Sequence, residues 1–135
     1  MTLAPLFHAP LAVQIHAATV IPAFFLGAWQ IFLSRKGQPA HRALGYIYLL
    51  LITIAAIAAL FIHALMPNSP FFGLSPIHIF VPLTLFGVAS ALYGAWTHNI
   101  RAHRSAMVGT YIGGLLIAGT LAFMPGRIMH AVAFG

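Results

Sequence analysis

The sequence predicts an all-α integral membrane protein, a four-helix bundle built from two tandem helical hairpins. Hydrophobic residues make up 61% of the 135-residue chain, and only 4% of its residues are charged. Such a chain has too few polar groups to keep its surface in water. Its apolar runs reach the ~20 residues that a membrane-spanning helix needs. We expect one four-span domain over residues 1–135, with two similar halves at about 11–65 and 77–124.

Sequence signals place the four spans in order. The first apolar run, roughly Leu11–Leu33, follows no basic segment and exceeds the ~7–15 residues of a signal-peptide core, so we expect it to be retained. The second and third, roughly Ala43–Leu65 and Ile77–Thr97, each follow a proline that a first helical turn tolerates. The fourth is the apolar run at roughly Ala106–Met124. Short connections leave room for one small bundle.

The two halves share a histidine spacing. His41 follows His16 by 25 residues, and His103 follows His78 by the same interval. A parallel repeat of this kind implies a pseudo-twofold axis along the membrane normal. We therefore expect His16 to face His78 and His41 to face His103 across the bundle, at two depths of the membrane.

The basic residues predict the orientation. Of the six, all but Arg127 lie in the connection between the first two spans or in that between the last two. These five are Arg35, Lys36, Arg42, Arg101 and Arg104. Basic residues mark the cytoplasmic side, which predicts a multi-pass protein of the bacterial inner (cytoplasmic) membrane with both termini periplasmic. Because the charges are divided between short connections, they predict no nucleic-acid partner.

The chain has no Asp, Glu or Cys. This composition excludes carboxylate general acids and bases, carboxylate-ligated Mg²⁺ or Ca²⁺, and cysteine nucleophiles or thiolate ligands. Histidine is left to carry any chemistry. Because no carboxylate can orient a ligand histidine, its second ring nitrogen should donate to a backbone carbonyl or to a neutral side chain such as Gln14 or Gln30.

The two histidine pairs suit the iron of haem b. Facing helices of a four-helix bundle hold this haem by one neutral imidazole from each side. His16 and His78 would ligate an outer haem, and His41 and His103 an inner one. Two haems at two depths would carry electrons across the membrane.

Residues beside the inner pair fit the rest of a haem. Gly45 lies four residues after His41, on the same helical face, and leaves space beside the ligand. Arg42 and Arg104 directly follow the inner histidines and are placed to pair with the haem propionates.

The same residues also support other interpretations. A histidine at the end of a spanning helix can simply reach water or lipid headgroups, and Gly109-x-x-x-Gly113 is a spacing that lets membrane helices approach closely. The alternative function is a non-catalytic membrane subunit that docks a larger complex or a second copy and binds lipid or quinone. A third is a quinone-binding redox enzyme without haem, so enzymatic activity stays open.

The chain resembles a prokaryotic family of small four-span membrane proteins that is catalogued as a domain of unknown function. The resemblance covers nearly the whole chain and implies the fold without an activity. It rests on His16, Gly27, Gln30, Arg35, Gly37, His41-Arg42, Gly45-Tyr46, Arg101-x-His103-Arg104-x-x-Met107 and the tail from Pro125 to Met129.

The arrangement is also similar to that of the diheme b-type cytochromes, which move electrons across membranes from ascorbate or quinol. In those proteins, alternate helices supply histidine pairs to an outer and an inner haem. The similarity implies the same roles for His16 with His78 and for His41 with His103.

Overall fold

The first half of the chain forms two long apolar helices. The computed structural model describes residues 2–61, 79–123 and 128–134. Helices α2 (Leu11–Phe32) and α3 (Pro39–Leu60) have 22 residues each and are long and apolar enough to cross a membrane. The bounds of α2 agree with those of the first predicted span to within one residue. Helix α3 begins four residues before the predicted apolar run, at Pro39, which confirms this proline as a first helical residue.

The second half forms α4 (Phe80–Trp96) and a composite helix. The composite helix consists of α5 (Ile100–Thr110), the π-helical segment η2 (Tyr111–Ile117) and α6 (Ala118–Ala122), which follow one another without a break. The predicted start at Ala106 is therefore wrong by six residues. The first two residues of the third predicted span lie outside the described residues.

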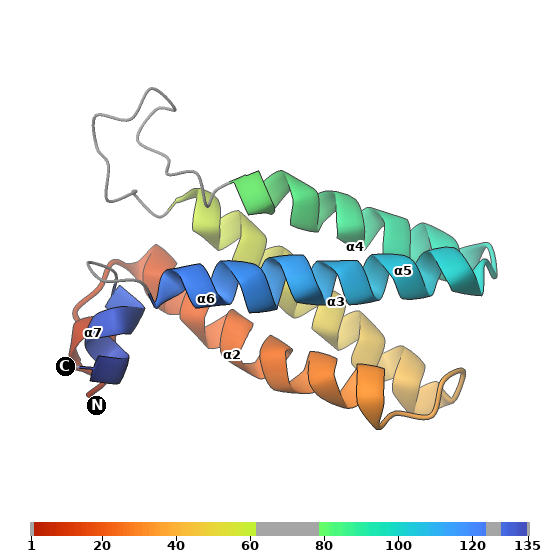
Figure 1. Cartoon of the computed structure of the whole chain (residues 1–135), viewed down its shortest axis with the longest axis horizontal. Helices are drawn as coiled ribbons and strands as arrows, with labels where there is room; N and C mark the ends of the chain where they lie inside the picture. Colours follow the sequence, from red (N-terminus) through yellow and green to blue (C-terminus); the bar gives the residue numbers. More distant parts are fainter. Residues whose placement is uncertain (1, 62–78, 124–127, 135) are drawn as a thin grey trace.

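Two short helices lie near the chain ends. Helices α1 (Ala4–Phe7) and α7 (Ile128–Phe134) contact each other, and both termini lie beside them (Figure 1). Helix α1 also contacts α2, so this group is attached to the long helices.

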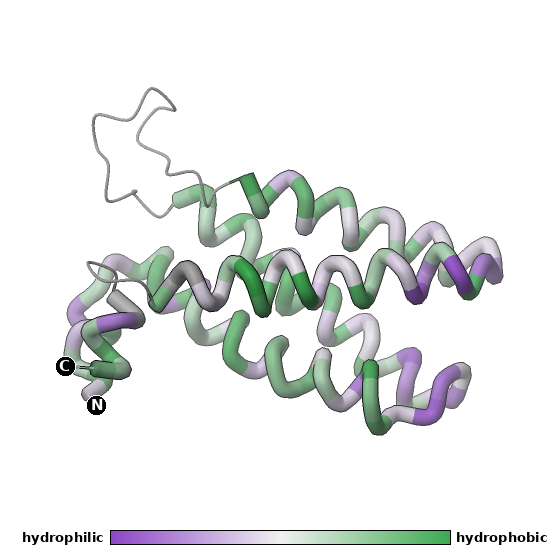
Figure 2. Tube along the Cα trace, in the orientation of Figure 1, coloured by the Kyte–Doolittle hydropathy of each residue, from purple (hydrophilic) through white to green (hydrophobic). Residues whose placement is uncertain are grey.

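The long helices pack in sequence order. Helix α2 packs on α3, α3 on α4, and α4 on α5, while η2 contacts both α2 and α4. The α2–α3 and α4–α5 connections lie at the same end of the helices (Figure 1). We call this the basic end, because Arg35, Lys36, Arg42, Arg101 and Arg104 lie in or beside these connections. Hydrophilic residues gather there, whereas the helix bodies are apolar (Figure 2).

Small and aromatic residues fill the space between the helices. Buried Ala23 and Ala91 allow close approach, and Tyr48 and Tyr111 fill the centre. The remaining buried members of this core are Leu49, Ile52 and Leu115.

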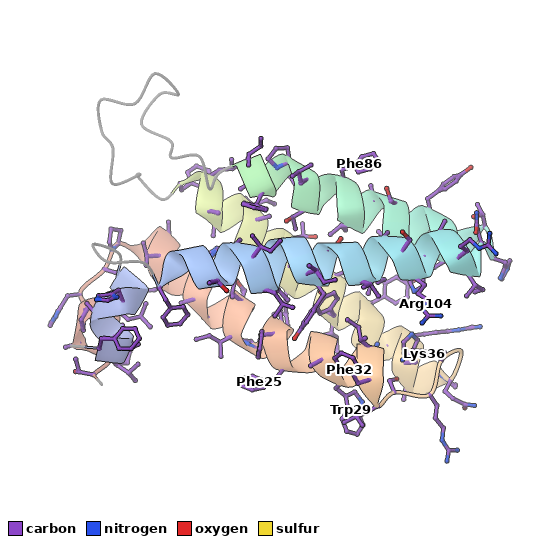
Figure 3. The ribbon with its side chains drawn as sticks, in the orientation of Figure 1. Phe25, Trp29, Phe32, Lys36, Phe86 and Arg104 are labelled. Carbon is purple, nitrogen blue, oxygen red and sulfur yellow. The ribbon has the colours of Figure 1, made fainter. Side chains whose placement is uncertain are left out.

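Large apolar side chains cover the outside of the helices. Phe25, Phe32 and Phe86 are 68%, 76% and 73% exposed and point away from the packed helices (Figure 3). A surface of this kind suits surroundings of lipid rather than water.

The α4–α5 turn explains why α5 begins early. The Asn99 side chain accepts a hydrogen bond from the Ala102 backbone N–H at 3.1 Å and so caps the new helix. At the end of α4, Asn99 N donates to Gly94 O and His98 N donates to Ala95 O, the paired bonds of a Schellman motif. His98 takes the left-handed position of this motif, with φ of 57°.

Replacing His98 by glycine should raise the free energy of unfolding by about 1 kcal/mol, because glycine adopts the left-handed conformation without the Cβ clash. Denaturation in detergent, followed by circular dichroism, measures the change. Thr97→Gly is the control: Thr97 has φ of −92° and bonds the Tyr93 carbonyl, so this change should destabilise the protein. Equal effects of the two changes would contradict the prediction.

Candidate functional site

His103 lies in the first turn of α5, on the side that faces α4. Its Nδ1 lies 2.9 Å from the backbone carbonyl oxygen of Ala91 on α4. A carbonyl oxygen only accepts, so Nδ1 must carry the proton and donate it. In the neutral ring, Nε2 therefore keeps its lone pair, which is the form that ligates a metal.

The contact between α4 and α5 at His103 depends on Gly94. A Cβ at Gly94 would lie 2.6 Å from His103 N and 2.9 Å from its Cα. The backbones of α4 and α5 approach this closely because glycine has no side chain. The contact fixes the position of His103 along α4.

His41 occupies the equivalent first turn of α3. Its Nδ1 lies 2.9 Å from the Ser34 hydroxyl, and its backbone carbonyl accepts a hydrogen bond from Gln30 Nε2 at 2.8 Å. The imidazole lies close enough to His103 and Lys36 for their charges to act on it. The structure therefore brings the predicted inner pair, His41 and His103, to the same end of the helices.

Of the predicted outer pair, the structure describes only His16. Its Nδ1 lies 2.7 Å from the Ala55 carbonyl oxygen on α3, so this nitrogen also donates to a backbone carbonyl. His78 lies outside the described residues, and the pairing of His16 with His78 stays a prediction.

For His16 and His103 the expected donation to a backbone carbonyl is confirmed, but the two glutamines act elsewhere. His16 and His103 use backbone carbonyls, and His41 uses a neutral hydroxyl. The Gln14 amide donates instead to the carbonyls of Phe7 and Ala9, at 3.1 and 2.9 Å. Gln30 holds the main chain of His41 rather than its ring, because its amide reaches only the start of α3.

The other three predicted site residues are close to the inner histidines along the chain. Gly45 lies one turn after His41, and a Cβ there would meet Gln30 Nε2 at an ordinary 3.5 Å. Arg42 and Arg104 are exposed. Arg104 lies at the basic end, as does Lys36 (Figure 3).

Lys36 stabilises the end of α2. Its ammonium donates to the backbone carbonyls of Gln30, Ile31 and Ser34, the last two at 3.1 Å each. A cation at these carbonyls complements the negative end of the helix dipole. The Lys36 ammonium is therefore already hydrogen-bonded to main-chain oxygens. Arg104 is the cation next to His103 in the sequence.

Two buried polar atoms without a partner were not expected from the sequence. Gln30 and Tyr48 are 3% and 1% exposed, and Gln30 Oε1 and the Tyr48 hydroxyl have no hydrogen-bond partner within the described ranges. Both residues stand in apolar helices, where hydropathy alone gives no sign that a polar atom points inward.

Tyr48→Phe should raise the free energy of unfolding by about 1 kcal/mol, because it removes a buried hydroxyl without a partner. Tyr111→Phe is the matched control. The Tyr111 hydroxyl donates to the Phe24 carbonyl at 3.1 Å, so its loss should destabilise by about 1 kcal/mol. Denaturant titration in detergent measures both, and a loss of stability in Tyr48→Phe would contradict the assignment.

The site offers a pair of imidazoles rather than a larger ligand cluster. In the part of the chain that the structure describes, no three or more His, Cys, Asp or Glu residues gather as a metal site would require. Two axial imidazoles are what a haem iron takes from a protein, since the porphyrin supplies its other four ligands.

Comparisons with known proteins agree with the apolar exterior of the helices. No curated protein and no solved structure matches the chain. A family model described as Predicted membrane protein (DUF2306) matches residues 13–133. The match covers most of the sequence, including all the histidines discussed above. The chain therefore belongs to this family of membrane proteins, a domain family of unknown function.

Proposed function

We propose that the chain is a b-type haem protein for transmembrane electron transfer, with His41 and His103 as the inner axial ligands. The observation that carries the proposal is that both histidines lie in first helical turns at the basic end, His41 on α3 and His103 on α5. The outer ligands would be His16 and His78, and this second pair rests on the sequence repeat.

The donors at the inner site fit haem b. Nδ1 of His103 is held by the Ala91 carbonyl, and Nδ1 of His41 lies at the Ser34 hydroxyl. Hydrogen bonds to the ring nitrogen that does not bind the metal orient a ligand imidazole and raise its basicity. The bound haem would supply one-electron redox chemistry.

The surroundings of the inner histidines also fit. Gly45 adds no side chain beside His41, although the Gln30 amide packs against this position, with Nε2 3.5 Å from where a Cβ would lie. Arg104 is exposed next to His103, and the chain has no Asp or Glu that would compete for its guanidinium. Arg104 is thus suited to pair with a propionate. Arg42 directly follows His41 and is the second candidate to pair with a propionate, although it shares a helix face with Tyr46.

We further propose that α2, α3, α4 and the α5–η2–α6 helix span a bacterial inner membrane as a four-helix bundle within one domain. The apolar exterior and the polar end of the helices support this topology. By the positive-inside rule, the basic end is cytoplasmic and both termini are periplasmic.

Purification from cells supplied with a haem precursor tests the proposal. We expect a coloured protein whose dithionite-reduced spectrum is of the b type, with one or two haems per chain. A colourless, folded protein that takes up no added haem would refute it.

The second candidate is a non-catalytic membrane subunit that docks a partner complex or another copy and binds lipid or quinone. It is favoured by Gly109 and Gly113, four residues apart on the α5–η2 helix, because a Cβ at either would have nothing within 4 Å among the described residues. Small residues at this spacing permit close helix contact. A pigment-free protein that co-purifies with a membrane complex would support this function.

A further inference from the structure

Two aromatic side chains meet on the outside of the α3–α4 seam at the basic end. The indole Nε1 of Trp96 donates to the Tyr46 hydroxyl oxygen at 3.0 Å. The two side chains are 63% and 55% exposed, so the bond lies at the surface. A phenol that accepts a hydrogen bond still has its own proton to donate. Within the described residues, no acceptor lies in hydrogen-bonding range of the Tyr46 proton.

A cation lies on the same face of α3. Arg42 is exposed and precedes Tyr46 by four residues, the spacing that places two side chains on one helix face. The chain contains no Asp or Glu, so no carboxylate side chain can neutralise this guanidinium. The seam therefore offers a positive charge and a phenolic donor, and an anionic oxygen would satisfy both.

We propose that Arg42, Tyr46 and Trp96 form a binding site for the phosphate of an anionic phospholipid headgroup. A guanidinium fits phosphate through two parallel hydrogen bonds, and the phenol supplies a third donor. Trp and Tyr side chains prefer the level of the headgroups, with their rings toward the acyl chains. The helices around the seam are apolar, as an acyl chain requires (Figure 2).

The site is distinct from the general positive charge of the basic end. Arg101 is exposed at the start of α5, but the residue four positions later is Ser105 rather than an aromatic donor. Tyr93 is 70% exposed on α4, and its hydroxyl has no indole partner among the described residues. These two residues supply matched controls for the charge and for the phenol.

Native mass spectrometry of the full-length protein in detergent tests the proposal. The probes are phosphatidylglycerol, phosphatidylcholine and inorganic phosphate. The test variants are Arg42→Gln and Tyr46→Phe, and the controls are Arg101→Gln and Tyr93→Phe. All four side chains are exposed, and circular dichroism checks that each variant keeps the helix content of the parent.

We expect phosphatidylglycerol to bind in preference to phosphatidylcholine. Arg42→Gln should lower its occupancy about fivefold, the effect of one basic residue near an anionic surface, and Tyr46→Phe should lower it measurably. Arg101→Gln and Tyr93→Phe should leave the occupancy unchanged. Equal losses in test and control variants would overturn the proposal, as would equal binding of the two lipids. Binding of inorganic phosphate that displaces the lipid would also overturn it, because the site would then serve a soluble anion.

Discussion

Replacing His103 by alanine is expected to remove the inner haem. Haem b is held by its axial ligands and by packing, and a chain without cysteine cannot attach it covalently. Loss of the hydrogen-bond partner of a ligand histidine alone lowers metal affinity roughly 10–100-fold, so loss of the histidine itself should lower it further. Haem per chain, measured after purification, gives the effect. His41→Ala should behave in the same way, because the two imidazoles act as a pair.

His98→Ala is the matched control for the two ligand variants. His98 lies at the same end of the helices, only five residues before His103, but it is exposed in the α4–α5 turn. Its replacement should leave the inner haem in place. Equal haem content in His41→Ala, His103→Ala and His98→Ala would exclude His41 and His103 as the ligands.

Gly94→Ala is expected to lower the free energy of unfolding by about 1–3 kcal/mol, the range for overpacking a close contact. The added methyl group would lie 2.6 Å from the backbone nitrogen of His103, and backbone atoms cannot turn aside as a side chain can. Helices α4 and α5 must separate to admit it. Because the Ala91 carbonyl and the His103 ring are joined across the same contact, the variant should also bind less haem.

Gly109→Ala provides the control for helix packing. Gly109 is on α5, as His103 is, but a Cβ there would have nothing within 4 Å. Alanine is a better helix former than glycine by about 1 kcal/mol, so this variant should be at least as stable as the parent protein. Denaturation of the two variants side by side in detergent measures the difference. Similar losses of stability in Gly94→Ala and Gly109→Ala would contradict the close approach of α4 and α5 at Gly94.

Hydropathy was sufficient to predict α2 and most of α3, because their apolar runs are long and a proline marks the beginning of α3. It failed at the start of α5. The segment from Ile100 to Ser105 contains two arginines and a histidine, so its polarity suggested a connection. It is helical because the Asn99 side chain caps it and α4 packs against it, and neither effect depends on hydropathy.

The bounds of the predicted spans correctly placed His41 and His103 at one end of the helices, whereas their facing each other across the bundle, which the repeat implies, stays a prediction. Neither signal predicted what holds them there. The bond from Gln30 to the His41 carbonyl and that from His103 to the Ala91 carbonyl both join different helices. Such contacts depend on the distance between helices, which no spacing along one helix reveals. For His103 this distance is set by the backbone approach of α4 and α5 at Gly94.

Electron paramagnetic resonance of the oxidised, purified protein tests most directly whether one imidazole from α3 and one from α5 ligate the same iron. Two axial imidazoles make ferric haem six-coordinate and low-spin. We therefore predict a low-spin ferric signal typical of two histidine ligands, which is lost or converted to high-spin in His103→Ala. A high-spin five-coordinate signal in the parent protein, or no ferric haem signal at all, would contradict the account.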